Sequence, residues 1–289
     1  LVALGVATLG TTPAPAQVAV RGKTVHTMAG PPVRDGVVLV RDGRVVAVGA
    51  SADVAIPAGF RLLEAEVVTP GLVDAHTVVG LSGQYNDRHD QEQLETTAPV
   101  QPELRAIDAY NPRERLVEWV RSFGVTTIHT GHGPGELISG QTMVIKTSGH
   151  APEADVILEP AAVAATLGPS ATRDRGPSKD GGRSPGTRGK QMAVLRAKLL
   201  EAQEAARRTA ADDPAKRPPR DLAVEALDRV LRREVPLLVT AQKAQDIANA
   251  LRLAEEFKLK LILDGAAEVD ILLGDVRRAG VPVILHPPM

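Results

Sequence analysis

The chain has 289 residues, 43% of them hydrophobic, so it can bury a full core and form one barrel or two smaller domains. Its 34 basic and 35 acidic residues nearly cancel, so charge gives no reason to expect nucleic acid or an anionic membrane as a partner. The absence of cysteine excludes disulfides, thiolate nucleophiles and cysteine-based zinc sites. We therefore expect a small-molecule substrate, and any metal would need His, Asp, Glu or a modified Lys.

The first 16 residues are typical of the end of a secretory signal peptide. An apolar run from Leu1 to Leu9 precedes the triplet Ala14-Pro15-Ala16, whose small residues suit signal peptidase. Residues 1–16 are therefore predicted to be a signal-peptide remnant of a periplasmic or secreted protein. No other run approaches the roughly 20 apolar residues of a membrane span, so the mature protein is expected to be free of the membrane. A homo-oligomer is compatible with the sequence.

Residues 17–67 predict a small β domain, which we expect to be sandwich-like. The runs Val37–Arg41 and Arg44–Val48 are rich in β-branched residues, and the pair Asp42-Gly43 between them favours a tight type I′ hairpin. Two further short strands are expected at Val18–Met28 and Leu62–Val67.

From Val67 onward, strand patterns alternate with helix patterns, which favours parallel βα units. The order predicts an α/β fold, a (β/α)8 TIM-type barrel over residues 68–289 that is incomplete at the C-terminus, where it ends after its seventh strand. Strands are expected at Val67–Asp74, Gly124–His129, Met143–Lys146, Asp155–Leu158, Val235–Thr240, Leu259–Leu263 and Val281–Leu285. Helices are expected at Pro112–Phe123, Met192–Ala211, Asp221–Arg233, Ala244–Phe257 and Val269–Ala279. Residues 168–190, dense in Gly, Pro, Ser and charge, are predicted to be a flexible insertion, either a solvated loop or a lid.

The segment from Pro70 to His76, which reads Pro-Gly-Leu-Val-Asp-Ala-His and follows the Asp-Gly-Arg hairpin, resembles the start of the amidohydrolase superfamily, in particular its imidazolonepropionase-like branch. The resemblance implies a small sheet before a barrel, a metal centre at the barrel mouth and hydrolysis of a C–N bond in a cyclic amide, dipeptide or similar small molecule. It also implies an eighth strand with a metal-binding Asp, which would lie beyond Met289, so we expect this sequence to be a fragment.

The resemblance implies metal ligands at the ends of strands 1, 5, 6 and 8, and this sequence keeps few of them. His76 matches, whereas Val78 stands at the second histidine position of strand 1, and Thr240 and Gln242 stand at those of strand 5. Asp264 stands at the strand 6 position, so His76 and Asp264 are the candidate ligands of a divalent metal, with zinc favoured. A catalytic zinc site needs about three protein ligands and a water. Two interpretations remain: a metal-dependent amidohydrolase-like hydrolase, or a non-catalytic barrel, without any metal, that acts as a binding or scaffold module.

Three further histidines are expected at the mouth of the barrel. His129 and His132 lie at the end of the second strand, and His286 lies at the end of the seventh. An imidazole titrates near pH ~6.5 and suits proton transfer, so these three are the candidate catalytic residues, as general bases or as a relocated metal cluster. The alternative is that they are polar residues of the mouth loops, hydrogen-bonded to backbone or water.

Overall fold

A computed structural model describes residues 17–83, 87–172, 185–210 and 218–286 of the chain. The chain divides into two compact units, with the division between Gly71 and Leu72, and each unit is described by itself. The predicted signal-peptide remnant, residues 1–16, lies outside the described residues. No helix among the described residues is long and apolar enough to cross a membrane.

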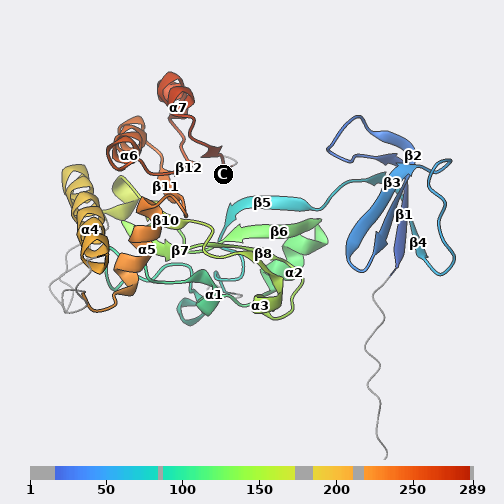
Figure 1. Cartoon of the computed structure of the whole chain (residues 1–289), viewed down its shortest axis with the longest axis horizontal. Helices are drawn as coiled ribbons and strands as arrows, with labels where there is room; N and C mark the ends of the chain where they lie inside the picture. The colour runs from blue at the N-terminus through green and yellow to red at the C-terminus, as the bar shows by residue number, and fades with distance from the viewer. Residues whose placement is uncertain (1–16, 84–86, 173–184, 211–217, 287–289) are drawn as a thin grey trace, which may run out of the picture. The chain divides into compact units, whose positions relative to one another are not determined.

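The first unit is a four-stranded sheet in the order β3-β2-β1-β4, coloured blue in Figure 1. Strands β1 and β2 and strands β2 and β3 pair antiparallel, and β1 pairs parallel with β4. Asp42 and Gly43 both have positive φ, 52° and 73°, as a type I′ hairpin requires. The strands are β1 (Val18–Val25), β2 (Val33–Arg41), β3 (Arg44–Ala50) and β4 (Arg61–Val68).

The sandwich-like character expected for this unit is not confirmed, because the described residues up to Gly71 form one sheet. Ala19, Val37 and Leu39 are buried on one face of that sheet. Val54 and Phe60, from the connection between β3 and β4, are among the residues packed against them. A ten-residue loop therefore covers the face on which a second sheet was expected.

The second unit contains two sheets. One has the order β5-β6-β8-β9 and the other β13-β12-β11-β10-β7, so the strands at the amino and carboxyl ends of the unit are both sheet edges. The strands are β5 (Leu72–Thr77), β6 (Val125–Thr130), β7 (Ile138–Gln141), β8 (Met143–Lys146), β9 (Val156–Leu158), β10 (Val163–Thr166), β11 (Leu237–Ala241), β12 (Leu261–Gly265) and β13 (Val283–Ile284).

These two sheets correct the expectation of parallel pairing throughout. Strands β10 to β13 are parallel, and so are β5 and β6, but β8 runs antiparallel to both β6 and β9, and β7 runs antiparallel to β10. A parallel crossover needs about a dozen residues or more, whereas the chain between β8 and β9 covers only residues 147–155. The mixed α/β architecture is consistent with a TIM-type domain, and closure of the barrel is not confirmed.

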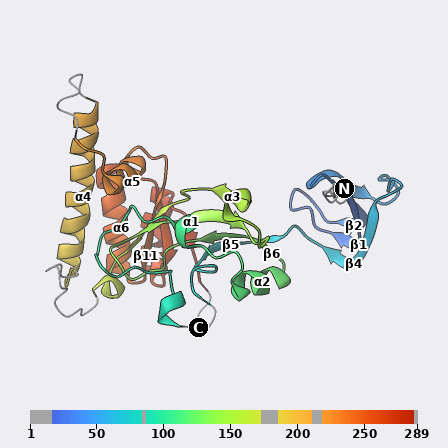
Figure 2. The same ribbon diagram turned by 90° about the horizontal axis from the view of Figure 1, so that it is seen from below.

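Helices cover the outer faces of both sheets. Helices α4, α5 and α6 pack with the parallel strands of the five-stranded sheet around one apolar core (Figure 1), and Figure 2 shows the same helices from a second side. A smaller core lies between β6, β8 and the short helices α1 and α2. The helices are α1 (Ala106–Ala109), α2 (Arg115–Ser122), α3 (Pro152–Asp155), α4 (Arg188–Thr209), α5 (Leu222–Leu231), α6 (Ala244–Phe257) and α7 (Leu273–Ala279), and the 3-10 turns are η1 (Arg88–Asp90), η2 (Pro169–Ala171) and η4 (Val269–Leu272).

The predicted insertion at residues 168–190 is ordered at both of its ends. Its first part forms η2, and its last three residues belong to α4. Helix α4 begins there because the Thr187 side chain accepts a hydrogen bond from the Lys190 amide, a typical N-cap. Arg188 then pairs with the buried carboxylate of Asp246, with 2.6 Å between Nε and Oδ1. Residues 173–184 lie outside the described residues.

Candidate functional site

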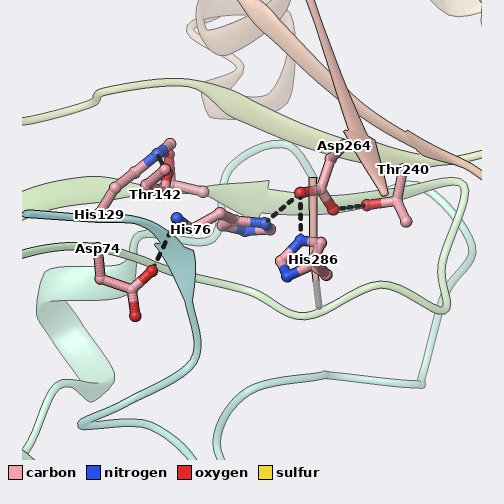
Figure 3. Close-up of polar contacts among 8 residues, drawn as sticks. Asp74, His76, His129, Thr142, Thr240, Asp264 and His286 are labelled. Carbon is pink, nitrogen blue, oxygen red and sulfur yellow. Dashed lines mark hydrogen bonds and ion pairs between the residues drawn. The ribbon is translucent and has the colours of Figure 1, made fainter. Parts of the chain in front are cut away.

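Three of the residues singled out in the sequence come together in the second unit. His76 lies in β5, Asp264 in β12 and His286 just after β13, and one ligand atom from each lies within 4.8 Å of the others. Figure 3 shows both imidazoles directed at one oxygen of the carboxylate and Thr240 at the other. We call this cluster the Asp264 centre. It joins β5 of one sheet to β12 and β13 of the other, and each of the three residues lies near or just beyond the carboxyl end of its strand.

Hydrogen bonds fix the carboxylate of Asp264 from three directions. Its Oδ1 lies 3.0 Å from His76 Nδ1 and 2.7 Å from His286 Nε2. Its Oδ2 accepts a hydrogen bond of 2.7 Å from the hydroxyl of Thr240 in β11. Because an ionised carboxylate only accepts hydrogen bonds, both ring nitrogens that face it carry a proton.

Asp264 is ionised at neutral pH although it is only 2% exposed. Burial acts to raise the pKa of this carboxyl, but the hydrogen bonds and charge of His76 and the hydrogen bonds from His286 and Thr240 outweigh it and hold the pKa at about 2. The centre therefore contains a fixed negative charge surrounded by polar groups.

One atom of the Asp264 centre is left without a partner. His76 Nε2 is buried and has no hydrogen-bond partner among the described residues. Leaving a buried ring nitrogen unsatisfied, whether it donates or accepts, costs about 1–3 kcal/mol.

Two imidazoles and a carboxylate are three ligands of the types that zinc binds in catalytic sites. Ligand atoms held at roughly 2.1 Å from zinc in a tetrahedral arrangement lie roughly 3.4 Å apart. The two nitrogens now lie 3.0 Å and 2.7 Å from Asp264 Oδ1, so small outward movements would make room for a cation in place of the two shared protons. The Asp264 centre thus fits one divalent cation, both in the number of its ligands and in their chemistry.

His129 lies beside this centre, but both of its ring nitrogens are occupied. Its Nδ1 donates to the carbonyl oxygen of Ala75 at 2.9 Å, and its Nε2 accepts from the hydroxyl of Thr142 at 2.7 Å. Burial lowers the pKa of His129, and the neighbouring His76 ring, 5.5 Å away between centroids, lowers it further. A neutral ring without a free lone pair cannot take a proton in this arrangement, so His129 serves here to hold β6 against the residue that precedes His76.

The structure places His132 elsewhere. His132 is 4% exposed and lines a separate cavity of about 270 Å³, the His132 cavity, to which none of the three residues of the Asp264 centre contributes. Burial lowers the pKa of His132 to about 4, so the ring is neutral. His286, in contrast, has a side chain that is 46% exposed and so opens the Asp264 centre to solvent.

The residues at the other expected ligand positions have structural contacts instead. Thr240 supports Asp264, and Gln242 accepts a hydrogen bond from the Ala267 amide in the loop after β12. Sequence reasoning did not find the part played by Thr240, nor that of Asp74, whose carboxylate accepts a hydrogen bond of 3.2 Å from the His76 amide. The register of parallel neighbours could have indicated the first, since Thr240 is paired directly with Asp264.

Comparison with known proteins finds similarity both in sequence and in structure. No protein-family model matches the chain. The chain is 26% identical over 157 residues to an imidazolonepropionase from Solibacter usitatus (strain Ellin6076), a match that covers 42% of this chain and 36% of that relative, so the chain spans about a third of its length. In structure it is similar to an amidohydrolase from Thermotoga maritima MSB8, with a TM-score of 0.85, 27% identity, and coverage of 93% of this chain and 70% of that one.

Proposed function

Because this chain belongs to the amidohydrolase superfamily, we propose that it is a hydrolase that cleaves a C–N bond in a cyclic amide, a dipeptide or a similar small molecule with the help of one divalent cation. The observation that carries the proposal is the Asp264 centre itself. Three ligand-type side chains from three strand ends converge within 4.8 Å, and one of them keeps a buried nitrogen unused.

His76, Asp264 and His286 would hold the cation, and zinc suits two imidazoles and a carboxylate best. A zinc ion in such a site lowers the pKa of a bound water to about 7 and polarises a carbonyl group. Everything else in the reaction depends on the chain's own residues.

Asp264 supplies charge and orientation. With a pKa of about 2 it is a poor proton acceptor, so its part is to stay ionised and to hold the two imidazoles. Thr240 and His129 position the ligand residues: Thr240 donates a hydrogen bond to the carboxylate of Asp264, and His129 donates one to the carbonyl oxygen of Ala75, next to His76. The exposed side of His286 is where a substrate would approach. The signal-like sequence at residues 1–16 supports a periplasmic or secreted location for this activity.

Metal content and activity of the purified protein test the proposal together. We expect about one zinc per chain by inductively coupled plasma mass spectrometry, and hydrolysis of at least one member of a panel of imidazolone propionate, cyclic amides and dipeptides. Asp264→Asn removes the negative charge of the Asp264 centre, so this variant should have neither bound zinc nor hydrolytic activity. The matched control is Asp270→Asn, since Asp270 is exposed in η4 and its replacement should change neither.

The opposite result is well defined. Folded protein that binds no divalent metal and hydrolyses nothing in the panel contradicts the proposal and favours the alternative, a barrel that acts only as a binding module. Metal that survives in Asp264→Asn contradicts the assignment of the site.

A further inference from the structure

A groove of about 1040 Å³, which we call the α6–α7 groove, is lined by one face of α6 and one face of η4 and α7. On α6 the lining residues are spaced three or four apart, from Ala248 through Leu251 to Glu255, and on η4 and α7 they run from Leu272 to Ala279 with the same spacing. The first residues of β12 and the segment just before β13 also line it. Two helix faces therefore stand beside a shared hollow.

The α6–α7 groove is separate from the Asp264 centre. Leu261 lines the groove at the first residue of β12, whereas Asp264 lies near the other end of that strand, about 10 Å further along at 3.3 Å per residue. None of the three residues of the Asp264 centre lines the groove. In a TIM-type domain the reacting groups gather at the carboxyl ends of the strands, so a groove at the amino ends suits binding rather than the reaction.

Apolar side chains that the protein core covers only in part line this groove. Leu251, Leu272 and Val281 pack against the core of the five-stranded sheet and stay half-buried. Leu158, the last residue of the edge strand β9, is 53% exposed. Covering apolar surface of this kind stabilises a complex by roughly 25 cal/mol per Å². The lining therefore favours a partner that has apolar side chains of its own.

The charged side chains of the groove are mostly basic, and the acidic ones already have partners. Glu255 forms an ion pair with Lys258, with 2.5 Å between Oε1 and Nζ, and Asp275 forms one with Arg278. Lys258 caps the carboxyl end of α6 and Arg278 lies in the last turn of α7, where a cation also offsets the helix dipole. These four residues thus have a structural role and leave no net charge.

Three further cations in the lining have no such partner. Arg233, Arg252 and Lys260 are exposed, and none of them forms an ion pair with any described residue. The whole chain has a formal net charge of −1, so this positive charge is a local feature and not a property of the surface in general. The groove therefore combines a partly exposed apolar lining with three cations that can pair with an anionic partner.

We propose that the α6–α7 groove binds an acidic amphipathic helix of a partner protein. Apolar residues of that helix pack against Leu251, Leu272 and Val281, and its carboxylates pair with the three cations. The length agrees, since α6 from Ala248 to its C-cap at Lys258 spans about 15 Å at 1.5 Å per residue, which is roughly three turns of a partner helix. A helix laid in an apolar groove is a common mode of recognition, and complementary charge sets its specificity.

Other occupants fit this groove less well. Its volume lies at the upper limit of the roughly 300–1,000 Å³ that small-molecule pockets occupy, and its length along α6 suits a chain segment. A nucleic acid is held chiefly through its phosphates, which would leave the apolar lining uncovered. The proposal rests on the groove alone and holds whether or not the Asp264 centre is catalytic.

Fluorescence anisotropy on the full chain tests the proposal with a labelled peptide of about 14 residues built from Leu, Glu and Ala, with Leu at every third or fourth position. This peptide should bind saturably with one site per chain. A peptide with Lys in place of each Glu should not bind, and one with Ser in place of each Leu should bind roughly tenfold or more weakly. The two comparisons separate the charge of the groove from its apolar lining.

Charge reversal within the groove locates the binding site. Arg252→Glu and Lys260→Glu should each weaken the acidic peptide by roughly tenfold or more, because each replaces an attraction by a repulsion. Lys190→Glu makes the same change at an exposed position of α4 that does not line the groove, so it should leave the affinity unchanged. Both groove positions are exposed, so the variants should fold, and circular dichroism checks this.

Four results would overturn the proposal. The first is folded protein that shows no saturable binding of the acidic peptide, and the second is unchanged affinity in both groove variants. The third is a dimer of the chain, seen by light scattering, that dissociates in Arg252→Glu, because a second copy would then occupy the groove. The fourth is a single-stranded oligonucleotide that binds more tightly than the peptide and loses its affinity in the same variants.

Discussion

The Asp264 centre and the His132 cavity each bury an ionisable side chain, and the two side chains differ in charge: Asp264 is ionised and His132 is neutral. In the Asp264 centre a buried carboxylate receives three donors, so its charge is retained. In the His132 cavity the ring receives no hydrogen bond from any described residue, so burial keeps it neutral. The difference teaches that burial alone does not decide ionisation, because the hydrogen bonds that accompany it do. Four experiments, from the largest expected effect to the smallest, sharpen or break this comparison.

Removing the carboxylate of the Asp264 centre should have the largest effect. Asp264→Ala leaves His76, His286 and Thr240 without their acceptor and should lower the free energy of unfolding by about 4 kcal/mol. Urea unfolding followed by the fluorescence of Trp119, the one tryptophan of the sequence and a residue of the second unit, measures it. Asp270→Ala is the control on an exposed site, and equal stability of the two variants would show that the three hydrogen bonds contribute nothing.

The His132 cavity should respond to pH in its own range. Burial lowers the pKa of His132 from 6.5 to about 4, so the unfolded chain binds a proton between these values while the folded protein does not. Stability that is present above pH 6.5 should therefore be lost on acidification, by about 3 kcal/mol on reaching pH 4. The difference in urea midpoint between the unchanged chain and His132→Leu isolates this contribution. A difference that stays constant from pH 7 to pH 4 would contradict a neutral buried ring.

The metal-free Asp264 centre should respond at lower pH. The folded pKa of Asp264, about 2, lies below its ordinary value of 3.8, so its contribution is full above about pH 4 and is lost as the pH falls through 2. The loss should be about 2 kcal/mol. The comparison is between the unchanged chain and Asp264→Asn in urea at pH 5, 4, 3 and 2. If the gap between the two does not narrow over this range, the carboxylate is not held ionised by its donors.

Thr240→Val is the smallest change and tests one donor of the Asp264 centre. It keeps the shape of the side chain, removes the 2.7 Å hydrogen bond to Asp264 Oδ2, and should lower the free energy of unfolding by about 1.5 kcal/mol. The variant should still bind zinc, but with lower affinity, because the carboxylate is less firmly held. Thr126→Val, at an exposed position of β6, is the control and should change stability by less than about 0.5 kcal/mol.

The sequence predicted most of the strands and the longer helices because their patterns are local. The Asp42-Gly43 turn and the alternation of strands and helices are each visible within a short window. The antiparallel direction of β8 was missed, because strand direction depends on the length of a connection and on pairing partners distant in the chain. Family resemblance correctly placed the chain in the amidohydrolase superfamily.

The residues of the candidate site could be predicted from the sequence, but the contacts between them could not. His76, Asp264 and His286 were all singled out, but under two separate roles, and their contact spans 188 residues from His76 to Asp264. A lone histidine in a sequence says nothing about its hydrogen bonds, so His129, with both nitrogens occupied, and His132, with neither, could not be told apart. Only the packing of β6 and β7 makes that distinction.

The most direct test is a crystal of the full chain grown with zinc and measured on both sides of the zinc absorption edge. The account predicts one anomalous peak among His76, Asp264 and His286, with the two imidazoles moved outward from Asp264 Oδ1. A zinc-soaked crystal with no peak at this position, and with His76 Nδ1 still hydrogen-bonded to Asp264, would contradict it.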